Sequence, residues 1–453
     1  MTRPRHIAVI DVGKTNAKLA LVDLDALEEV AVVTRPNAVR PGPPWPHFDL
    51  EGHWAFFLRH LARFQESHGI DGISVTTHGA AAVLLQADGT LAAPMLDYEH
   101  DGPDALHAEY DALRPPFEET GAPRLPGGLN LGAQLHWLFA TDPGLRARTA
   151  HIVTYPQYWG FRLTGKYATD VTSLGCHTDL WAPRDGRLSA LADRLGIDGL
   201  LAPAHHSSDV LGVITPAVAD LTGLPRETPV LCGIHDSNAS LLPHLMGRTG
   251  PFTVVSSGTW VVAMAIGGEA GVLDSARDTL INTSAFGDPV PSARFMGGRE
   301  FELIRDGAEV TPTPEDRARV LCDSVMLLPS VVPESGPFPG RAARWTAEPA
   351  SDGERLFALA LYLALMTDTC LSLIGARGPT VVEGPFARNA DFLAMLCACR
   401  GEVETADSAT GTSIGAAQLF GAGGAAPATA PVTTAAEPGM RGYADSWRAL
   451  CQV

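Results

Sequence analysis

Two short polar turns carry residue types that could hold a polyphosphate. In the first, apolar runs within residues 7–23 flank a turn that contains Asp11, Gly13, Thr15 and Lys18. The pattern predicts a strand, a tight turn and a returning strand, because the apolar runs would bury themselves in a sheet. Gly13 lets backbone amides approach an anion closely, and Thr15 and Lys18 add hydrogen-bond donors. The alternative is a buried hairpin whose Asp-x-Gly sequence serves only the turn.

The second turn repeats this pattern far along the chain. The apolar run Phe252–Val255 leads into Ser256–Thr259 and out again through Trp260–Ala265. Two such hairpins predict two related halves. Each half would offer a hydroxyl-and-glycine turn to the same polyphosphate from opposite sides of a cleft.

A carboxylate stands just ahead of the second hairpin. Asp236 lies in the segment Gly233–Ser237, directly after the apolar run Val230–Cys232. This position favours a general base, because a carboxylate at hydrogen-bond distance can accept the proton of an attacking hydroxyl group. The alternative is a structural aspartate that caps the following helix.

The three motifs, in this order, resemble those of the FGGY carbohydrate kinases, a family of actin-like phosphotransferases with the ribonuclease H fold. The first hairpin is similar to the family's Asp-x-Gly-x-(Ser/Thr)-x-x-(Lys/Arg) phosphate motif. Gly233–Asp236 is similar to its catalytic Gly-x-His-Asp, and Ser256–Trp260 to its second phosphate turn. The resemblance runs from Ile7 to Phe420 and points more narrowly to the L-rhamnulokinase and L-fuculokinase branch.

The resemblance implies an α/β fold class with two actin-like (ribonuclease H-like) domains and an interdomain active-site cleft. The length of 453 residues also favours two domains, because one hydrophobic core rarely serves so long a chain. We expect an N-terminal sugar-binding domain over residues 5–245, which carries the first phosphate motif and the base. A C-terminal nucleotide-binding domain is expected over residues 246–424, followed by a linker and tail over residues 425–453.

The resemblance also implies the reaction and its cofactors, ATP and Mg²⁺. Asp236 would accept the proton of a sugar hydroxyl as its oxygen attacks the γ-phosphorus, and Asp11 would hold Mg²⁺ through water. The resemblance assigns to the nucleotide Gly13, Lys14, Thr15, Asn16, Lys18, Ser257, Gly258, Thr259, Gly384 and Asn389. It assigns to the sugar His78, Gly79, Asp101, His235, Asp236 and Ser237.

Two segments depart from the family pattern. Residues 97–101, Asp-Tyr-Glu-His-Asp, lack the arginine that relatives carry beside the sugar, and residues 383–385, Glu-Gly-Pro, keep only the middle glycine of the adenosine motif. His78 stands where relatives often have tryptophan, so a purely structural histidine is the alternative to a sugar contact. A 6-deoxyketose such as L-rhamnulose or L-fuculose is the closest resemblance, while xylulose, ribulose, polyols and aldoses stay open.

Two interpretations from other functional classes stay open beside the kinase. One is an actin-like nucleotide-binding regulator without catalysis, and the other is an ATPase that drives a conformational change in a partner. A regulator would be expected to lose the base or to carry a basic DNA-binding segment, whereas Asp236 is present.

Composition limits the partners. The formal net charge of −18 argues against nucleic acid, which would require a basic face. The seven cysteines have no paired metal-ligand spacing, so we expect reduced thiols. Residues 1–6 contain no apolar signal core, and we expect no apolar run near the roughly 18 residues that span a bilayer. The sequence therefore predicts a cytoplasmic protein without a membrane partner, and a homodimer is one open alternative for its assembly.

Periodicity predicts the elements that position these residues. Apolar residues at helical spacing predict helices over residues 52–68 and 352–374, and a strand over residues 72–79 ends at Gly79. Residues 421–439 are predicted to be a flexible linker and residues 443–450 a short docking helix. Gly160–Lys166 imitates a phosphate-binding loop but lacks its metal-binding hydroxyl, and we assign no chemistry there or to residues 169–181.

Overall fold

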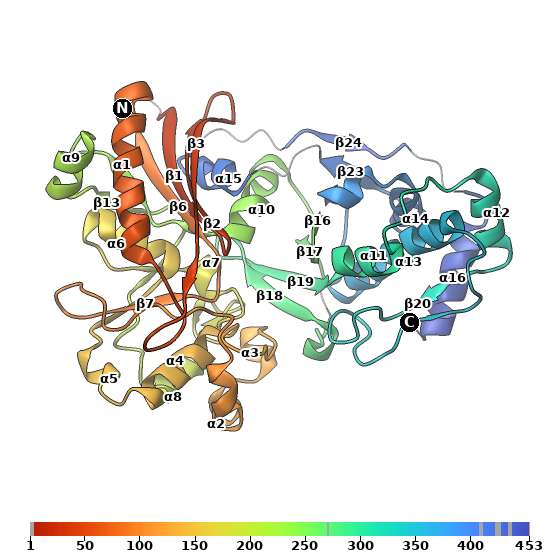
Figure 1. Cartoon of the computed structure of the whole chain (residues 1–453), viewed down its shortest axis with the longest axis horizontal. Helices are drawn as coiled ribbons and strands as arrows, with labels where there is room; N and C mark the ends of the chain where they lie inside the picture. The colour runs from red at the N-terminus through yellow and green to blue at the C-terminus, as the bar shows by residue number, and fades with distance from the viewer. Residues whose placement is uncertain (1–3, 270, 407–410, 422–426, 434–436, 453) are drawn as a thin grey trace. The chain divides into compact units, whose positions relative to one another are not determined.

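The computed structural model describes residues 4–269, 271–406, 411–421, 427–433 and 437–452, which fall into two compact units (Figure 1). The first unit takes residues 1–248, 281–289 and 410–426, and the second takes residues 249–280, 290–409 and 427–453. The predicted boundaries differ from this division in three places, one of which is residues 281–289, which belong to the first unit. A helix near the end of the predicted second domain belongs to the first unit, and the predicted tail belongs to the second unit.

The first unit is built on a mixed sheet in the order β13, β14, β6, β1, β2, β3, with β15 also paired to β6. Strands β1, β2 and β3 are antiparallel, and β6 runs parallel to β1. The strands are β1 (His6–Val12), β2 (Asn16–Asp23), β3 (Glu28–Pro36), β6 (Gly72–Thr77), β13 (Val210–Val213), β14 (Pro229–Leu231) and β15 (Ile234–His235).

The remaining elements of the first unit are helices that cover this sheet and short strands in the connections. The helices are α1 (Leu50–His68), η1 (Gly102–Leu106), α2 (His107–Leu113), α3 (Phe117–Thr120), α4 (Leu131–Thr141), α5 (Leu145–Arg148), α6 (Tyr155–Thr164), α7 (Val171–Leu174), α8 (Ala190–Arg194), α9 (Pro216–Thr222), α10 (Asp236–Gly247) and α15 (Thr412–Gln418). The short strands are β4 (Val39–Arg40), β5 (His47–Phe48), β7 (Ala82–Leu85), β8 (His151–Thr154), β9 (Thr169–Asp170), β10 (Trp181–Ala182), β11 (Arg187–Leu188) and β12 (Ala204–His205).

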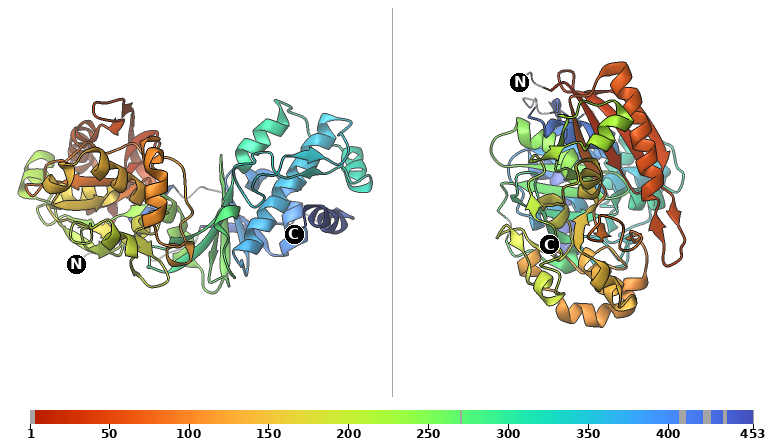
Figure 2. Two further views of the ribbon diagram at one scale, coloured as in Figure 1. Left: turned by 90° about the horizontal axis from the view of Figure 1, so that it is seen from below. Right: turned by 90° about the vertical axis from the view of Figure 1, so that its left-hand side faces the viewer.

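Alternate residues of β1 point to opposite sides of the first sheet, and residues on both sides are buried, so both faces of the sheet are covered. Ala8 and Ile10 pack in one core with Phe57 of α1, and that helix lies along the sheet in both views (Figures 1 and 2). Ile7 and Val9 pack in a second core with residues of α10 and α15. The predicted helix over residues 52–68 is therefore confirmed, with its apolar face on the sheet.

The second unit repeats the arrangement of the first sheet. Strand β16 is antiparallel to β17 and parallel to β22, as β1 is to β2 and β6. The sheet order is β18, β19, β17, β16, β22, β23, β24. Its strands are β16 (Phe252–Ser257), β17 (Val261–Ile266), β18 (Thr279–Thr283), β19 (Pro289–Phe295), β22 (Thr380–Glu383), β23 (Val403–Ala406) and β24 (Thr429–Pro431). The repeat agrees with the two related halves expected from the hairpins.

The other elements of the second unit pack around one long helix. They are η2 (Ser275–Arg277), α11 (Gly297–Arg305), α12 (Pro314–Cys322), α13 (Asp352–Leu373), η3 (Pro385–Arg388), α14 (Ala390–Arg400), α16 (Met440–Cys451), β20 (Leu327–Leu328) and β21 (Arg344–Trp345). Among the described residues, α13 alone is long and apolar enough to cross a membrane, which corrects the expectation of no such run. Of its most apolar stretch 83% is buried, which is the behaviour of a core helix.

Within the described part of residues 421–439, for which a flexible linker was predicted, the chain forms a strand. Strand β24 pairs with β23, while residues 422–426 and 434–436 lie outside the described residues. Helix α16 docks through its aromatic residues: the Tyr443 hydroxyl donates to the Val325 carbonyl at 2.9 Å, and Trp447 Nε1 donates to the Leu327 carbonyl at 2.8 Å. The predicted docking helix is thus confirmed.

A buried carboxyl group in the second unit couples stability to pH. Glu300 of α11 is fully buried, and its two oxygens accept from the Val332 backbone N–H and the Tyr362 hydroxyl, each at 3.0 Å. Burial dominates over these hydrogen bonds and raises the pKa of Glu300 from 4.5 to about 7. Below pH 4.5 the group is protonated in both the folded and the unfolded chain. As pH rises from 4.5 to about 7, only the unfolded chain readily loses the proton, so stability falls.

We therefore predict that Glu300→Gln removes a pH-dependent loss of stability. The difference between the folded and unfolded pKa values corresponds to up to about 3 kcal/mol, lost between pH 4.5 and 7. The difference in free energy of unfolding, variant minus wild type, should be larger at pH 8 than at pH 5. Denaturant titration at both pH values measures this difference. The exposed Glu309→Gln serves as control. An equal wild-type-to-variant difference at both pH values would contradict the prediction.

Candidate active site

The sheet of the first unit brings three strand ends together at one edge. β1 and β15 both run parallel to β6, and Thr76 of β6 pairs with Asp11 on one side and Ile234 on the other. Asp236 follows two residues later as the first residue of α10. Two strand spacings of about 4.8 Å each therefore lie between the backbones of β1 and β15. The two predicted functional carboxylates thus belong to the same edge of one sheet.

The turn between β1 and β2 presents backbone groups without side-chain cover. The Gly13 N–H donates to the Asn16 carbonyl at 2.9 Å, and Thr15 and Asn16 are exposed. A Cβ atom added at Gly13 would find only the Asn16 carbonyl oxygen nearby, at 3.7 Å. Open space therefore adjoins the turn, so that an anion could approach its amides.

A buried asparagine holds this turn from behind. Asn37 Nδ2 donates to the Gly13 carbonyl at 2.8 Å, and its backbone N–H donates to the Thr15 carbonyl at 2.8 Å. Burial, aided by the charge of Arg35, lowers the pKa of His53 to about 4, so this ring is neutral. Arg35 can only donate to His53 Nδ1, 3.3 Å away, which leaves the ring hydrogen on Nε2 to donate to Asn37 Oδ1 at 2.8 Å. His53 thereby fixes which end of the Asn37 amide faces the turn.

Asp11 is held by donors from two distant segments. Its Oδ2 accepts hydrogen bonds from the hydroxyls of Thr412 and Ser413, the latter at 3.2 Å, and lies 3.1 Å from Lys18 Nζ. The same ammonium lies 3.1 Å from Glu29 Oε1. Burial opposes the charge of Lys18, but Asp11 and Glu29 outweigh it and raise the pKa of Lys18. Lys18 is therefore bound in a side-chain cluster and does not extend freely from the turn, as a phosphate contact would require.

The residues around Asp11 fit a magnesium ion held through few protein atoms. Among the described residues, no group of three or more His, Cys, Asp or Glu side chains is placed to hold a metal. Magnesium commonly keeps several waters and takes one or two carboxylates together with substrate phosphates. Asp11 suits this pattern, because its described donors all contact Oδ2 and leave Oδ1 for a metal-bound water.

Asp236 has one fixed and one open carboxylate oxygen. Its Oδ1 accepts from the Ser237 backbone N–H at 2.6 Å and lies 3.1 Å from His235 Nε2. No donor among the described residues contacts Oδ2, and the side chain is 31% exposed. Asp236 is not the capping residue of α10, because His235 occupies that position. A half-buried carboxylate with one open oxygen is suited to accept a proton.

His235 is held from its backbone and from its ring. Its N–H donates to the Thr172 hydroxyl at 2.9 Å, and its Nε2 lies 3.5 Å from Cys176 Sγ. Gly79 is pressed against this ring, since an added Cβ would stand 2.7 Å from His235 Nε2. Glycine is therefore required at position 79 for packing, whether or not its backbone meets a ligand.

His78 faces the same region with an unused ring nitrogen. Its ring packs against Phe48, Tyr98 and Tyr155, with centroid distances between 5.0 and 5.3 Å, and Nδ1 lies 2.9 Å from the Gly79 carbonyl. Burial lowers the pKa of His78, so the ring is neutral. Its Nε2 is buried and has no hydrogen-bond partner among the described residues. Such an orphaned buried nitrogen calls for a ligand or a water.

Lys14 lies on this side of the turn and not toward the predicted phosphates. Its ammonium pairs with Asp97, lies 2.9 Å from Glu99 Oε2, and sits 4.6 Å from the centre of the Tyr98 ring. The charge of Asp236 acts on Tyr98, whose pKa is raised mainly by burial. Two carboxylates therefore neutralise Lys14 in this structure, and its assignment to the nucleotide stays a prediction.

Asp101 is not brought to this cluster. Its side chain is 94% exposed and pairs only with His100, at 3.6 Å, in the loop before η1. The acidic residues that do approach are Asp97 and Glu99, which the sequence analysis left without a role beyond the altered motif. Ser237, in contrast, lies beside Asp236 as predicted and is exposed.

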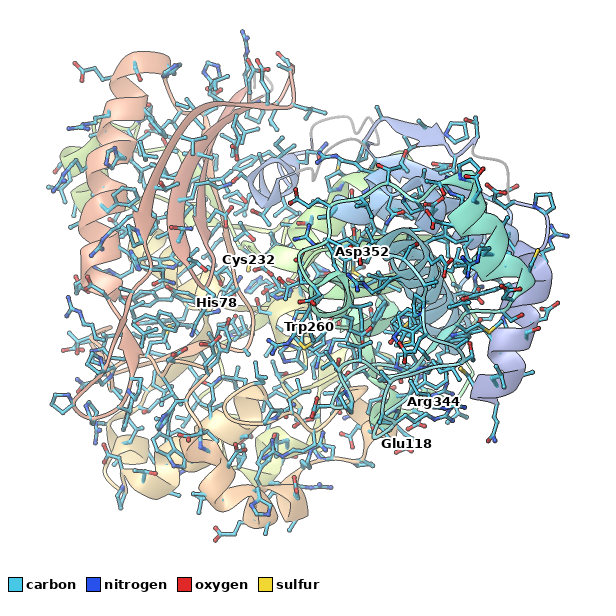
Figure 3. All side chains as sticks on the ribbon, turned by 45° about the vertical axis from the view of Figure 1, so that its right-hand side comes forward. His78, Glu118, Cys232, Trp260, Arg344 and Asp352 are labelled. Atoms are coloured by element: carbon cyan, nitrogen blue, oxygen red, sulfur yellow. The ribbon has the colours of Figure 1, made fainter. Side chains whose placement is uncertain are left out.

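The predicted nucleotide residues of the second unit divide into exposed and structural ones. Gly258 and Thr259 are exposed at the tip of the β16–β17 hairpin, next to Trp260 (Figure 3). Ser257 is buried instead, where its hydroxyl donates to the Glu383 carbonyl and accepts from the Phe386 N–H at 3.0 Å. The Ser257 hydroxyl therefore links two segments of the second unit, and its assignment to the nucleotide stays a prediction.

Two further residues of the predicted adenosine motif have clear structural roles. Gly384 has a φ of +82°, and an added Cβ would stand 2.0 Å from the Ser257 carbonyl oxygen, so only glycine fits. Asn389 caps α14 through its side chain, which accepts from the Phe392 N–H at 3.0 Å. The assignment of Gly384 and Asn389 to the nucleotide stays a prediction.

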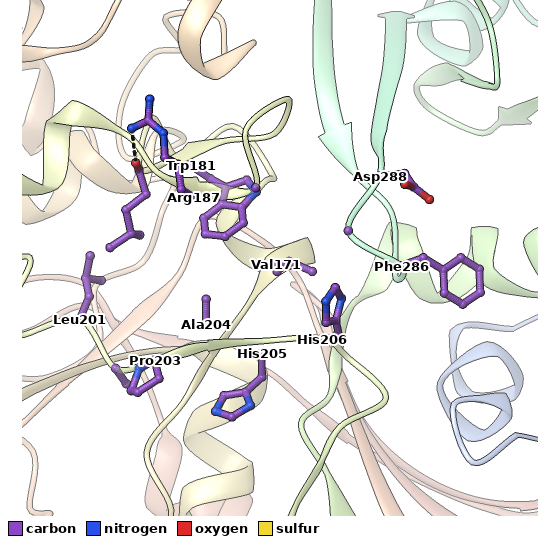
Figure 4. Close-up of a pocket in the computed structure, with 14 residues that line it drawn as sticks. Val171, Trp181, Arg187, Leu201, Pro203, Ala204, His205, His206, Phe286 and Asp288 are labelled. Carbon is purple, nitrogen blue, oxygen red and sulfur yellow. Dashed lines mark hydrogen bonds between the residues drawn. The ribbon is translucent and has the colours of Figure 1, made fainter.

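A separate hollow of about 530 Å³ lies in the first unit (Figure 4). Its mostly apolar wall includes Trp181, Leu201, Pro203 and Phe286. The lining contains none of the predicted site residues, so it is distinct from the edge that carries Asp11 and Asp236.

The family comparisons agree with these motifs. Residues 6–243 match the N-terminal domain of the FGGY family of carbohydrate kinases, and residues 249–429 match the C-terminal domain described as carbohydrate kinase FGGY. The chain therefore belongs to the FGGY family of carbohydrate kinases. Its expected α/β fold with two family domains is confirmed, and so is the family.

The structural comparison extends over the whole chain. A carbohydrate kinase from Novosphingobium aromaticivorans is 36% identical, with a TM-score of 0.91 and 99% of each chain covered. Xylulose kinase from Rhodospirillum rubrum has a TM-score of 0.77 at 21% identity, covering 99% of this chain and 98% of its own, which is a likeness of fold.

Named relatives match over shorter stretches. L-fuculokinase from Escherichia coli K12 is 27% identical over 57% of this chain, and a probable L-xylulose kinase from Pasteurella multocida is 27% identical over 57% of this chain. The matches span 56% and 55% of these relatives, little more than half of their length. A rhamnulokinase from Klebsiella pneumoniae is 26% identical over 39% of this chain and of its own length. These identities do not separate the predicted rhamnulokinase and fuculokinase branch from the xylulose kinases.

Several contacts at this edge have no local signal in the sequence. Thr412 and Ser413 lie about four hundred positions from Asp11, and Cys176 lies 59 positions from His235. Asn37 directly follows β3, a strand that the sequence analysis did not predict, so its contact with the turn was not predicted either. The remaining partners depend on how the whole unit folds.

We predict that Asn37→Ala loosens the turn of residues 13–16. The variant loses a hydrogen bond worth about 1 kcal/mol, so amide hydrogens of the turn should exchange about fivefold faster while β6 keeps its protection. Hydrogen exchange followed by mass spectrometry measures this. Asn389→Ala, which removes a helix cap in the other unit, is the matched control and should leave residues 13–16 unchanged. Unaltered exchange in Asn37→Ala would show that the amide does not support the turn.

Proposed function

We propose that this chain is an ATP-dependent kinase for a small sugar, with Asp236 as the general base. The observation that carries this proposal is the shared edge of the first sheet. There the open Oδ2 of Asp236 and the uncovered turn after β1 follow strands that pair with the same neighbour, β6. Phosphoryl transfer to an alcohol needs a base for the hydroxyl group and a binding site for the phosphates.

Asp236 handles the proton of the acceptor. A sugar hydroxyl donates its hydrogen bond to Oδ2, and the proton passes to that oxygen as the hydroxyl oxygen bonds to the γ-phosphorus and the bond to ADP breaks. Ser237 and His235 keep Oδ1 occupied, so the carboxylate cannot turn its open oxygen away. The charge of Asp236 remains accessible because the side chain is only half-buried.

The groups around His78 are proposed to bind the sugar. His78 Nε2 has no partner among the described residues and would take a sugar hydroxyl. Lys14 and Glu99, paired at 2.9 Å, offer a donor and an acceptor on one side, and the Tyr98 ring offers an apolar surface. A site with fixed donors and acceptors discriminates epimers, because each group left unpaired costs about 1–3 kcal/mol.

The phosphates of ATP are proposed to meet the turn of residues 13–16 through backbone amides and the Thr15 hydroxyl. Gly258 and Thr259 of the second hairpin are proposed to add further donors, as the family motif implies. Mg²⁺, when bound near Asp11, would neutralise charge on the phosphates and so favour attack by the hydroxyl. Asp11 is already oriented for this by Thr412 and Ser413.

We propose a 6-deoxyketose, L-fuculose or L-rhamnulose, as the acceptor. Support comes from the L-fuculokinase and rhamnulokinase relatives and from the aromatic rings of Phe48, Tyr98 and Tyr155 around His78, which suit an apolar methyl group. Xylulose is the competing acceptor, since xylulose kinases are equally similar in sequence. We place the reaction in the cytoplasm.

We predict that Asp236→Asn abolishes sugar-dependent ADP release. Loss of the base should lower kcat by about 10²-fold or more, because a positioned base contributes roughly 10² to 10⁴ to the rate. A coupled ADP assay measures this, with nucleotide binding followed separately. Asp101→Asn, at a side chain 94% exposed, is the control and should retain wild-type turnover. A kcat for Asp236→Asn near the wild-type value would overturn the role of Asp236.

A screen of ketoses, aldoses and polyols tests the acceptor. We expect L-fuculose-type and L-rhamnulose-type ketoses to give the highest kcat/KM in the coupled assay, with aldoses at least about tenfold lower. If D-xylulose or L-xylulose exceeds them, the deoxyketose proposal is wrong while the kinase stands. If no sugar stimulates turnover although ATP binds, the chain is a nucleotide-binding regulator instead.

A further inference from the structure

Asp170 collects hydrogen bonds in the segment 169–181, to which no chemistry was assigned from the sequence. This carboxylate of β9 is fully buried. Its Oδ2 accepts from the hydroxyls of Thr172 and Ser207, the latter at 3.1 Å, and from the Thr172 N–H at 3.0 Å. Its Oδ1 accepts from the Ser173 N–H at 3.1 Å. Because a buried carboxylate is costly unless donors satisfy it, Asp170 is expected to hold these neighbours in fixed positions.

The hydroxyl of Thr172 has its single hydrogen committed to Asp170. A hydroxyl group has one hydrogen and two lone pairs, whereas an ionised carboxylate can only accept. Thr172 Oγ1 therefore turns a lone pair toward its other neighbour, the His235 N–H, and accepts from it at 2.9 Å. Asp170 thus fixes which side of the Thr172 hydroxyl donates and which side accepts.

The contact of Thr172 with His235 takes the place of a strand. β15 is only two residues long, and among the described strands it pairs with β6 alone. The N–H of His235 donates to the side chain of α7 instead of to a further strand. Without the Thr172 hydroxyl, this N–H would be left unsatisfied directly ahead of Asp236.

Ser207 gives Asp170 a second connection to the same backbone. The Ser207 hydroxyl donates to Asp170, and the Ser207 carbonyl accepts from the Gly233 N–H at 3.2 Å. Gly233 has a φ of +95°, and an added Cβ would stand 2.8 Å from the Val75 carbonyl oxygen. Residues 233 and 235 are therefore both tied to Asp170.

The ring of His235 carries this restraint to the proposed base. The Asn238 amide nitrogen lies 3.3 Å from His235 Nδ1. An amide nitrogen can only donate, so Nδ1 accepts and Nε2 carries the ring hydrogen. That Nε2 lies 3.1 Å from Asp236 Oδ1, which also accepts from the Ser237 N–H. The orientation of the carboxylate therefore depends on where the backbone of His235 is held.

We propose that Asp170 and Thr172 are positioning residues for the phosphoryl transfer. Oriented by Asp170, the Thr172 hydroxyl holds the His235 N–H. The backbone ahead of Asp236 is thereby fixed, and its open Oδ2 is aimed at the acceptor. This proposal rests on the proposed function and adds to it two side chains that are fully buried and touch no substrate. A displaced base slows the transfer, because the reacting groups must be held in near-contact geometry.

Hydrogen exchange resolved to single amides tests the contact without any activity. In folded wild type the His235 amide should exchange as slowly as the amides of β6, a result that needs no variant. Thr172→Val keeps the shape of the side chain but removes the hydroxyl, so the His235 amide should exchange about fivefold faster. Thr172→Ser keeps the hydroxyl and should keep the wild-type rate. Fast exchange in wild type, or unchanged exchange in Thr172→Val, overturns the proposal.

The kinetic arm separates positioning from packing. Thr172→Val should lose about tenfold in kcat with KM for ATP unchanged, while Thr172→Ser should stay within about twofold of the wild-type kcat. Thr178→Val is the matched control, because Thr178 is also buried in the segment 169–181 but its hydroxyl donates to the Leu174 carbonyl. We expect Thr178→Val to keep the wild-type kcat.

Two kinetic results overturn the proposal: a wild-type kcat in folded Thr172→Val, or an equal loss of kcat in Thr178→Val. The proposed function can fail separately. If the exchange rates of the His235 amide behave as expected but the wild type phosphorylates no sugar, the kinase assignment is wrong and the contact of Thr172 with His235 stands.

Discussion

A carboxylate that serves as a base must be exposed enough to meet its substrate and still be held in one orientation. Asp236 meets both demands because it stands one residue beyond a strand, at the start of a helix. β15 fixes the backbone of His235 by pairing with Thr77 of β6, and α10 then begins at once. The N–H of Ser237 in the first helical turn occupies Oδ1. The free N–H groups at a helix start favour a nearby negative charge, so the same feature that orients the carboxylate also stabilises it.

β6 is the strand on which the rest of this edge depends. It is buried along its whole length, it lies between β1 and β15, and the His78 N–H that follows it donates to the Val12 carbonyl at 2.9 Å. One strand therefore sets the positions of the first turn, of His78 and of Asp236. A change in register of β6 by one residue would turn its side chains to the other face and separate these groups.

The sequence predicts several of the helices and strands named above but few of the hydrogen bonds and ion pairs that their side chains make. Two apolar runs on either side of the Asp-x-Gly turn were sufficient to predict the β1–β2 hairpin. Helical spacing was sufficient to predict α1 and α13, because these signals are local. The direction of a long side chain is not local. Lys14 and Lys18 lie four residues apart on one hairpin, yet one pairs with Asp97 and Glu99 and the other with Asp11 and Glu29. Ser257 reads as a phosphate ligand by motif, but the distant Glu383 carbonyl takes its hydroxyl.

Asp11 and Asp236 show how one sheet edge can give two identical side chains different tasks. Asp11 is 8% exposed and its Oδ2 is surrounded by two hydroxyls and an ammonium, which hold the carboxylate in one orientation. Hydrogen bonds to a charged group are among the stronger ones in proteins. Asp236 keeps one oxygen without a donor among the described residues and is more exposed, so accepting a proton there breaks no contact. The number of donors around each carboxylate therefore distinguishes the two residues: Asp11 is enclosed and fixed, whereas Asp236 offers one open oxygen.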